Sequence, residues 1–306
     1  MLCCNKFVAV GLPPLTILLA TCQPGLSAPA FAELKAQADQ GDAKAQYELA
    51  RCYAKGLNTA QNDSEAVSYL LKSATQGYAF AETELAACFA KGLGTNADLA
   101  QAAFWYQKAA EQGDPLGQFG LGNFYYHGRG IAEDKGEAIK WWTRAAEQNL
   151  AAAQDALGQY YFELAGRDRA YASNYIAAAK WLGRAADQGY VGSMNNLAYL
   201  YENGYCVPQD LTNACKWYRI AAEHGVAKAQ SNLGLMYQEG TVVPRDLVEA
   251  YKWFKLSALQ HDPVGRRYVE DYGDAHRLTD AELQEANKRV AEFRKRSRTD
   301  NVVTKP

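Results

Sequence analysis

A nine-residue segment that recurs at fixed intervals constrains this chain more than any other feature. One copy reads Trp217-Tyr-Arg-Ile-Ala-Ala-Glu-His-Gly225. Neighbouring copies lie 36 residues apart, except for one step of 40 residues between Trp141 and Trp181. A fixed period in this range is the mark of a repeat array, so the chain is expected to grow by adding units rather than by enlarging one core. The copies begin at Tyr69, Trp105, Trp141, Trp181, Trp217 and Trp253.

Six full units follow from this period, and each reads as a first helix, a loop, a second helix and a turn. Their ranges are 43–78, 79–114, 115–150, 151–190, 191–226 and 227–262. The fold class predicted from them is all-α, a solenoid of helix-turn-helix repeats. Residues 31–42 resemble the second half of a repeat and are expected to form an N-terminal capping helix.

The same apolar positions recur in every unit. In the first helix a leucine is followed by a small residue, and four residues after the leucine comes an aromatic ring, which places leucine and ring on one helical face. The tryptophans of the second helix are expected to act as core wedges between helices. The leucines are Leu49, Leu85, Leu121, Leu157, Leu197 and Leu233; the small residues are Ala50, Ala86, Gly122, Gly158, Ala198 and Gly234; the rings are Tyr53, Phe89, Tyr125, Tyr161, Tyr201 and Tyr237.

Helix ends are also marked. A glycine just past the first helix supplies the left-handed cap conformation, and an aspartate opens the second helix. Asp134 with Glu137, and Asp246 with Glu249, fit a capping box that uses Asp. The glycines are Gly56, Gly92, Gly128, Gly204 and Gly240; the aspartates are Asp98, Asp134, Asp210 and Asp246.

The composite unit resembles the Sel1-like repeat, a relative of the tetratricopeptide repeat. The motifs Leu233-Gly-x-x-Tyr237 and Ala214-x-x-Trp-Tyr218 carry this resemblance well, and Tyr69 in place of Trp weakens it in the first unit. The resemblance covers residues 43–262. It implies a right-handed superhelix of antiparallel helix pairs and an adaptor role in signalling, envelope processes or host contact, without one shared activity.

Two segments depart from the repeat. Four extra residues of the fourth unit fall within 165–174. They are expected to form a surface loop, and the alternative is that they change the direction of one face of this repeat. Residues 263–300 are expected to form a C-terminal cap, with Thr279 and Glu282 as a capping box and Leu283, Ala286, Val290 and Phe293 on one face. The basic run 294–298 complements the dipole of that helix. Residues 301–306 read as a tail.

Residues 1–30 indicate export. Lys6 is their only charge, the segment 7–20 is largely apolar and too short to span a bilayer, and Ala28-Pro-Ala30 offers small residues to a signal peptidase. We therefore expect a signal peptide over 1–30 and a periplasmic or secreted protein, with an uncleaved anchor as the alternative. Leu19-Ala-Thr-Cys22 resembles a bacterial lipoprotein box except at its Thr, so lipid attachment at Cys22 stays open.

Four cysteines remain after such a cleavage. Cys52 and Cys88 share one repeat position in an otherwise apolar column and are expected to be buried thiols. Cys206 and Cys215 lie in the loop and the second helix of the same unit, where a disulfide is plausible in an oxidising compartment. Some secreted members of the resembled family pair cysteines within each repeat.

The leading functional hypothesis is a binding scaffold without catalytic activity. The resemblance implies a concave groove lined by the first helices, and aromatic rings mixed with amides suit an extended peptide or a partner helix. Some of these rings are alternatively expected to pack between units. The groove candidates are Tyr47, Arg51, Phe80, Phe119, Asn123, Tyr126, His127, Gln159, Asn195, Asn196, Tyr199 and Asn232.

Other functions are less supported by the sequence. A net charge of −2 and a pI of about 6.1 argue against nucleic acid as a partner. Catalytic motifs and clustered histidines are missing, so neither catalytic residues, nor a metal site, nor a cofactor is expected. A cell-envelope enzyme or a protein that binds β-lactam or peptidoglycan, using Glu163 or Glu202, is the alternative, and a host-directed secreted scaffold is another. We expect a monomer that meets a membrane only if it is lipid-anchored.

Overall fold

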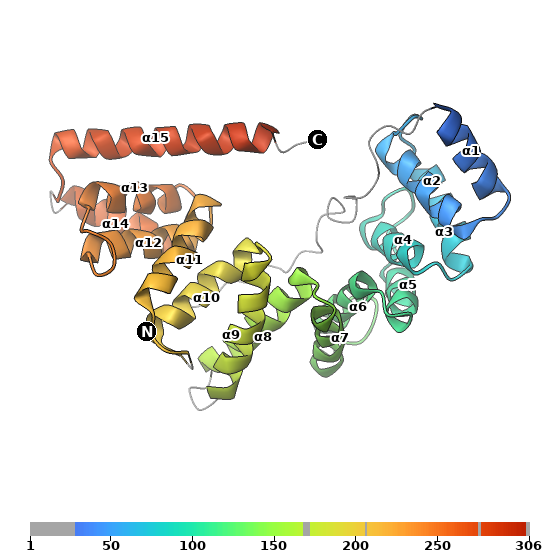
Figure 1. Ribbon diagram of the computed structural model, residues 1–306, viewed down its shortest axis with the longest axis horizontal. Coiled ribbons are helices and arrows are strands. Elements are labelled where there is room, and N and C mark those ends of the chain that lie inside the picture. Colours follow the sequence, from blue (N-terminus) through green and yellow to red (C-terminus); the bar gives the residue numbers. More distant parts are fainter. Residues whose placement is uncertain (1–27, 168–171, 206, 275–276, 304–306) are drawn as a thin grey trace. The chain divides into compact units, whose positions relative to one another are not determined.

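The structure is a computed structural model of the 306-residue chain, and it describes residues 28–167, 172–205, 207–274 and 277–303. These residues form fifteen α-helices and no strand (Figure 1), which confirms the predicted all-α repeat fold. The signal peptide proposed for 1–30 and Cys22 lie outside the described residues, apart from Ala28 to Ala30 at the start of the first helix. That helix begins at Ala28 rather than at Phe31.

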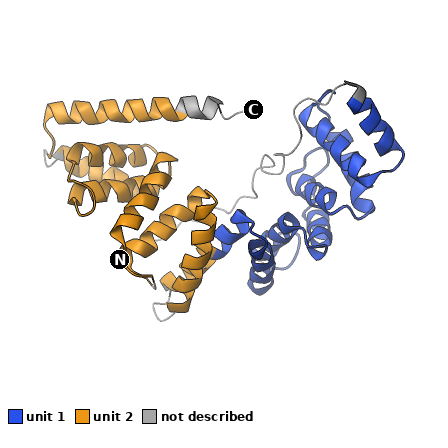
Figure 2. Cartoon of the chain, in the orientation of Figure 1, with its two compact units in different colours: residues 1–157 blue, residues 158–306 orange. Residues whose placement is uncertain are grey.

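The chain divides into two compact units, residues 1–157 and 158–306, with the boundary inside helix α8 (Figure 2). The helices before the boundary are α1 (Ala28–Asp39), α2 (Ala43–Lys55), α3 (Asp63–Thr75), α4 (Ala79–Lys91), α5 (Leu99–Glu111), α6 (Pro115–His127) and α7 (Lys135–Glu147). From the boundary on, they are α8 (Ala151–Arg167), α9 (Ala172–Asp187), α10 (Val191–Asn203), α11 (Leu211–Glu223), α12 (Ala227–Glu239), α13 (Leu247–Ala258), α14 (Pro263–Asp274) and α15 (Asp280–Val303).

The predicted helix ends are confirmed. The five capping glycines adopt φ between 62° and 71°, a left-handed conformation that only glycine reaches cheaply. The four aspartates accept hydrogen bonds from backbone N–H groups of the next turn. Only half of the capping box forms at Asp134 and Asp246, because the side chains of Glu137 and Glu249 bind lysines instead.

The core follows the predicted leucine column, whose six members are all buried. The small-residue column is buried too. Its residues contact the large side chains that the second helix of each pair places against the first. A Cβ on Gly122 would stand 2.4 Å from Cδ1 of Trp142, and one on Gly234 would stand 2.7 Å from the ring of Phe254. Each small residue therefore lets the second helix press one large side chain against the backbone of the first.

The identity of these wedges corrects the expectation for the tryptophans. Trp181 and Trp253 are buried, but Trp105, Trp141 and Trp217 are only partly buried. The next residue in every unit is the more deeply buried one, because it faces the small residue. Cations cover several rings of the tryptophan column, as with Arg144, whose guanidinium lies 4.5 Å from the centre of Trp141. The wedges are Leu70, Tyr106, Trp142, Leu182, Tyr218 and Phe254.

A recurring polar pair, in which a glutamine amide donates to a second amide or to a carboxylate, closes the first, second, third and sixth repeats. Gln76 donates to Oε1 of Gln46 at 2.8 Å, which links the end of α3 to the start of α2. Gln46 itself donates to the carbonyl of Ala38 in the preceding helix. The equivalent pairs are Gln112 with Glu82, Gln148 with Gln118, and Gln260 with Gln230. Neither of the two units depends on apolar packing alone.

The extra residues of the fourth repeat do not form only a loop. Helix α8 has 17 residues and α9 has 16, compared with 13 in most other helices of the array. Leu164 stands where other repeats carry the capping glycine, so nothing stops α8 before Arg167. Residues 168–171 lie outside the described residues. The insertion therefore lengthens two helices.

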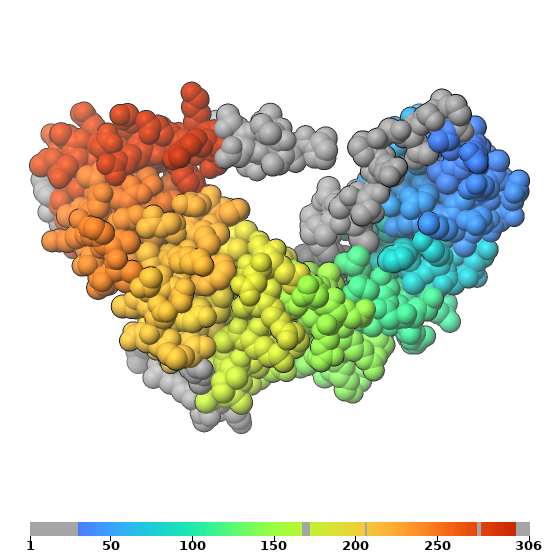
Figure 3. Space-filling view, viewed as in Figure 1, coloured from blue at the N-terminus to red at the C-terminus, as the bar shows by residue number. Residues whose placement is uncertain are grey.

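The C-terminal cap consists of two helices. In α15 the predicted capping box is complete: the backbone N–H of Thr279 donates to Glu282, and the backbone N–H of Glu282 donates to Oγ1 of Thr279. Ala286 and Val290 are buried, and Leu283 and Phe293 are partly buried. Helix α15 continues to Val303, into the segment predicted to be a tail, and in the space-filling view it lies directly on α13 (Figure 3).

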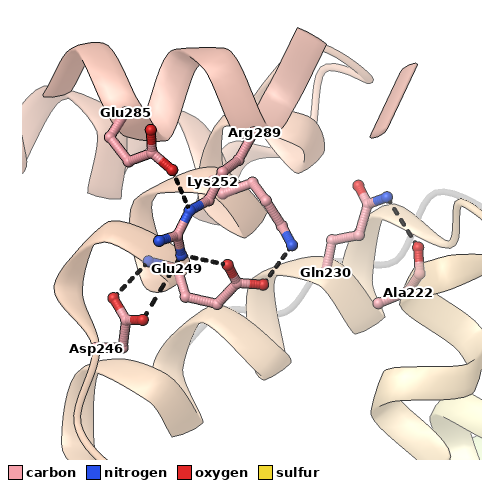
Figure 4. Close-up of polar contacts among 7 residues, drawn as sticks. All are labelled: Ala222, Gln230, Asp246, Glu249, Lys252, Glu285 and Arg289. Carbon is pink, nitrogen blue, oxygen red and sulfur yellow. Dashed lines mark hydrogen bonds and ion pairs between the residues drawn. The ribbon is translucent and has the colours of Figure 1, made fainter. Parts of the chain in front are cut away.

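Charged side chains join α15 to α13 (Figure 4). The guanidinium of Arg289 lies 3.0 Å from Oε2 of Glu249, 3.0 Å from Oε1 of Glu285 and 3.7 Å from Oδ2 of Asp246. Glu249 also pairs with Lys252, which is 8% exposed. One partly buried carboxylate thus serves two cations, one from each helix.

Candidate functional site

The first three groove candidates lie on α2 and at the start of α4, in the first compact unit. The ring of Tyr47 lies 6.3 Å from that of Phe80 and 5.5 Å from the guanidinium carbon of Arg51. Phe80 is 49% exposed, whereas Tyr47 and Arg51 are buried. The hydroxyl of Tyr47 donates to Oε1 of Glu84 at 3.0 Å. Of the three candidates, only Phe80 presents a large apolar surface to solvent.

Helix α6 carries the next four candidates, of which two are buried. Asn123 accepts a hydrogen bond of 3.2 Å from the indole of Trp142, so it supports a core wedge. Tyr126 packs on the same indole, with ring centres 5.0 Å apart, and His127 packs on Tyr126. Phe119 is 2% exposed. This ring is therefore part of the core and offers little surface to a ligand.

Unpartnered polar atoms concentrate on these same residues. Among the described residues, seven buried side-chain nitrogen or oxygen atoms have no hydrogen-bond partner, and four of them belong to groove candidates. They are Nε and Nη2 of Arg51, Nδ2 of Asn123 and Nε2 of His127. Buried polar groups are usually paired, so such a group calls for an explanation at each place where it occurs.

Register explains why these atoms share a face. Arg51 and Asn123 are each the ninth residue of the first helix of their repeat, and Ala87 holds that position on α4 between them. We call Arg51, Ala87 and Asn123 the ninth-residue row. His127 lies one helical turn beyond Asn123 on the same face.

In the second unit, amide side chains form a short chain across two helices. Asn232 on α12 donates to Asn195 on α10 at 3.4 Å, and Asn195 donates to Asn196 at 3.3 Å. Asn195 is 9% exposed, while Asn196 and Asn232 are partly buried. The structure therefore brings these three candidates together. Gln159 on α8 is partly buried as well.

Beside the amides lies a group of four rings, which we call the aromatic surface: Phe162, Tyr175, Tyr199 and Tyr205. Tyr175 stacks on Tyr205 with ring centres 4.7 Å apart, and Tyr199 contacts Tyr205 at 5.9 Å and Phe162 at 5.7 Å. Tyr199 is 37% exposed, and the adjacent Ile176 is 57% exposed. Only Tyr199 of this group was predicted from the sequence.

Burial changes the acidity of several groups near the first-unit candidates. Burial raises the pKa of Glu84 to about 7, against which the hydrogen bond from Tyr47 and the charge of Arg51 act. Burial lowers the pKa of His127, and the charge of Arg129 lowers it further. Glu84 therefore changes its charge near neutral pH.

The chemistry proposed for an enzyme finds little support in the described residues. Glu202 accepts a hydrogen bond of 2.7 Å from the buried Tyr218, so it is held in a structural pair. Glu163 is partly buried. No group of three or more His, Cys, Asp or Glu side chains in the described part of the chain is arranged to hold a metal ion.

Three of the cysteines expected in the mature chain lie among the described residues. Cys52 and Cys88 are buried thiols, as expected, and burial raises the pKa of Cys88 to about 12. Cys215 is buried in α11. Cys206 lies outside the described residues, so the disulfide between Cys206 and Cys215 stays a prediction.

Across the described ranges, none of the helices combines the length and apolar character that crossing a membrane requires.

Comparisons with known proteins agree on the repeat. The model of the Sel1 repeat matches residues 43–78, 79–114, 115–150, 151–190, 191–226 and 227–262, the ranges that the periodicity indicates. A search of curated protein sequences gives no match.

The solved structures similar to this chain include two crystal structures of repeat proteins. One is c5321, a protective antigen of uropathogenic Escherichia coli strains, with 33% identity, a TM-score of 0.74 and coverage of 88% of this chain and 56% of that one. This chain thus spans about half the length of c5321. The other is a Sel1 repeat protein from Oxalobacter formigenes, with 27% identity, a TM-score of 0.63 and coverage of 75% of this chain and 90% of that one.

Proposed function

This chain belongs to the Sel1 repeat family, whose members generally serve as protein–protein interaction scaffolds, and on that premise we propose that it binds an extended peptide segment of a partner protein. The binding face is formed by the first helices of the repeats. The protein acts as a monomeric adaptor without catalytic activity, in the cell envelope or the secreted fraction. The N-terminal sequence pattern supports this compartment.

The observation that carries the proposal is the aromatic surface beside the amide chain of the second unit, in which Tyr199 is exposed and the other three rings are partly buried. Tyr199 offers a rigid, partly apolar ring, and such rings contribute large contact area at a small loss of side-chain entropy. Asn196 lies one turn before Tyr199 on α10, and Asn232 on α12 is linked to α10 through Asn195. The amides of Asn196 and Asn232 suit the N–H and C=O groups of a peptide backbone. Rings and amides together match an extended segment better than a flat protein surface.

Site-specific photo-crosslinking tests this proposal in the native organism. A photoreactive phenylalanine analogue replaces Tyr199 in one variant and Lys140 in the control, because Lys140 is exposed on α7, the second helix of its repeat. We expect a discrete adduct from position 199, and mass spectrometry of that adduct should map to one short partner segment. Adducts of equal yield from both positions, or from position 140 alone, contradict binding at this surface.

A competition experiment separates a peptide from a folded partner surface. A synthetic peptide of the mapped segment should suppress the adduct at position 199, and a scrambled peptide of the same composition should not. If only the intact partner competes, the chain recognises a folded surface and the proposal of an extended segment is wrong.

A further inference from the structure

Arg51 stands out among the buried groups of the first unit. It is 3% exposed, and its Nε and Nη2 atoms have no hydrogen-bond partner within the protein. Its remaining terminal nitrogen, Nη1, lies 3.5 Å from Oε2 of Glu48, at the limit of a hydrogen bond. A guanidinium that is buried and mostly unpaired is unfavourable, because several N–H groups have lost water without replacement.

The two unpaired nitrogens share one edge of the guanidinium. The N–H groups of Nε and Nη2 point in the same direction along that edge, and their spacing matches the two oxygens of a carboxylate. No described side chain supplies that carboxylate. Glu84, the nearest buried acid on α4, accepts from Tyr47 instead.

The neighbouring positions provide a small side chain and an apolar contact. Ala87 follows Arg51 in the ninth-residue row, so the helix beside Arg51 carries only a methyl group there. Phe80 is 49% exposed, and the rings of Tyr47 and Tyr78 pack against it at 6.3 Å and 5.7 Å. Beyond Ala87, the unpaired Nδ2 of Asn123 is a further donor without an acceptor.

We propose that the ninth-residue row of the first unit recognises a carboxylate of the bound peptide, with the Nε–Nη2 edge of Arg51 as the anion-binding group and Phe80 as the adjoining apolar contact. All three unpaired atoms of the row are donors, so the ligand must bring acceptors. A carboxylate supplies two of them to Arg51, and a backbone carbonyl of the same segment supplies one to Asn123. The inference rests on the proposed function, because it names a chemical group of the partner.

Arg51 reaches this ligand with its own flexibility. We expect this long side chain to rotate toward the exposed Phe80 on binding, which would carry the guanidinium out of its buried position. Leaving that position removes the unfavourable burial of two unpaired N–H groups. The free energy of binding therefore has two favourable parts: the unpaired N–H groups are no longer buried, and a new ion pair forms.

The test uses N-acetyl-phenylalanine, which joins a free carboxylate to an apolar ring, and its amide as the matched neutral probe. NMR spectroscopy of the full chain follows the Nε–Hε signal of Arg51, assigned by its absence in Arg51→Met. The carboxylate should shift this signal in a saturable manner with a Kd on the order of 1 mM, a range ordinary for so small a fragment. The amide should not shift the Arg51 signal. The Nε–Hε signal of Arg144 serves as the control and should not shift with either probe.

Two variants separate recognition from a structural role. Arg51→Met should abolish the response of neighbouring backbone signals and keep or raise the stability of the fold, because an unpaired buried charge has been removed. Arg51→Lys should bind at least about tenfold more weakly, because it keeps the charge but loses the fork.

Equal shifts with both probes, or none with either, overturn the carboxylate site, and the second result assigns the free edge of Arg51 to water. The comparison of acid with amide on the unaltered chain stays valid if a variant fails to fold. A crosslink at position 199 together with a silent Arg51 overturns this inference alone. Loss of the crosslink overturns the proposed function.

Discussion

The hydroxyl of Tyr47 on α2 donates a 3.0 Å hydrogen bond to Oε1 of Glu84 on α4, which joins the first helices of two successive repeats. Glu84 is 4% exposed, and burial raises its pKa from 4.5 to about 7. A buried carboxyl with a raised pKa prefers its protonated form, which is neutral. Burial of Glu84, against which the hydrogen bond from Tyr47 acts, therefore couples the stability of the first unit to pH near neutrality.

The pH dependence of unfolding should reveal this coupling. Between pH 4.5 and 7 the folded state holds a proton on Glu84 that the unfolded state releases, so the free energy of unfolding falls as pH rises through this window. A shift of this size corresponds to roughly 3 kcal/mol. Urea denaturation of Glu84→Gln should show a gain over the wild type that is absent below pH 4.5 and full above pH 7. The exposed Glu111→Gln serves as control, and a gain that does not change with pH refutes the coupling.

Gly122 should resist substitution although it lies inside a helix. Alanine normally favours a helix over glycine by about 1 kcal/mol. Here its Cβ would stand 2.4 Å from Cδ1 of Trp142, and the indole cannot withdraw without losing its hydrogen bond to Asn123. We expect Gly122→Ala to lower the free energy of unfolding by about 1–2 kcal/mol in urea denaturation.

A second substitution should repair this loss. In other repeats Ala86 shares a core cluster with Tyr106, and Ala198 shares one with Tyr218, so an alanine at this position is compatible with a tyrosine wedge. Gly122→Ala combined with Trp142→Tyr should regain most of the lost stability. A double variant no better than the single one shows that close packing at Gly122 is not the cause.

The ion pairs between α13 and α15 should contribute unequally. Arg289→Ala removes a partly exposed cation and leaves Glu249 paired with Lys252, so we expect a loss of about 0.5–1 kcal/mol. Glu249→Ala leaves Lys252 buried without its carboxylate, and burial already lowers the pKa of this lysine. That variant should lose about 3 kcal/mol in urea denaturation. Equal losses in the two variants contradict this order.

The sequence predicted the architecture because the repeat shows the same side-chain pattern six times. The leucine column, the capping glycines and the capping aspartates all occupy their expected places. The wedges escaped prediction because their identities differ between units: Leu70 and Trp142 hold equivalent positions. The tryptophan before them recurs more regularly, which favoured it as the predicted wedge, although it is the less buried of the two wherever it occurs.

The candidate site was less predictable than the fold. Its register followed from the repeat, which placed Arg51, Asn123 and Tyr199 at one position. Exposure did not follow, because it depends on which neighbouring side chain covers each residue: Phe119 is buried while Phe80 is not. Tyr175 lies near the start of α9, which the insertion lengthens, and Tyr205 lies just past α10, so the repeat pattern did not place these two rings beside Tyr199.

The fifth repeat lacks the amide pair that closes the sixth repeat, and this difference gives a fourth prediction. Met194 and His224 stand where Gln230 and Gln260 stand in the sixth repeat. Met194→Gln alone should lower the free energy of unfolding by about 1–2 kcal/mol, because it buries an amide whose carbonyl oxygen has no donor. His224→Gln alone should change it by less than about 0.5 kcal/mol, since His224 is exposed.

Together the two substitutions should recreate the pair, with the amide at position 194 donating to the carbonyl of Ala186, as Gln230 does to Ala222. The double variant should then be more stable than the sum of the single effects by about 1 kcal/mol, a coupling measured by a double-mutant cycle in urea. The same cycle on Gln230→Met and Gln260→His supplies the matched control, where the coupling should appear as a loss. Additive effects in both cycles mean that these amides fill space without linking the helices.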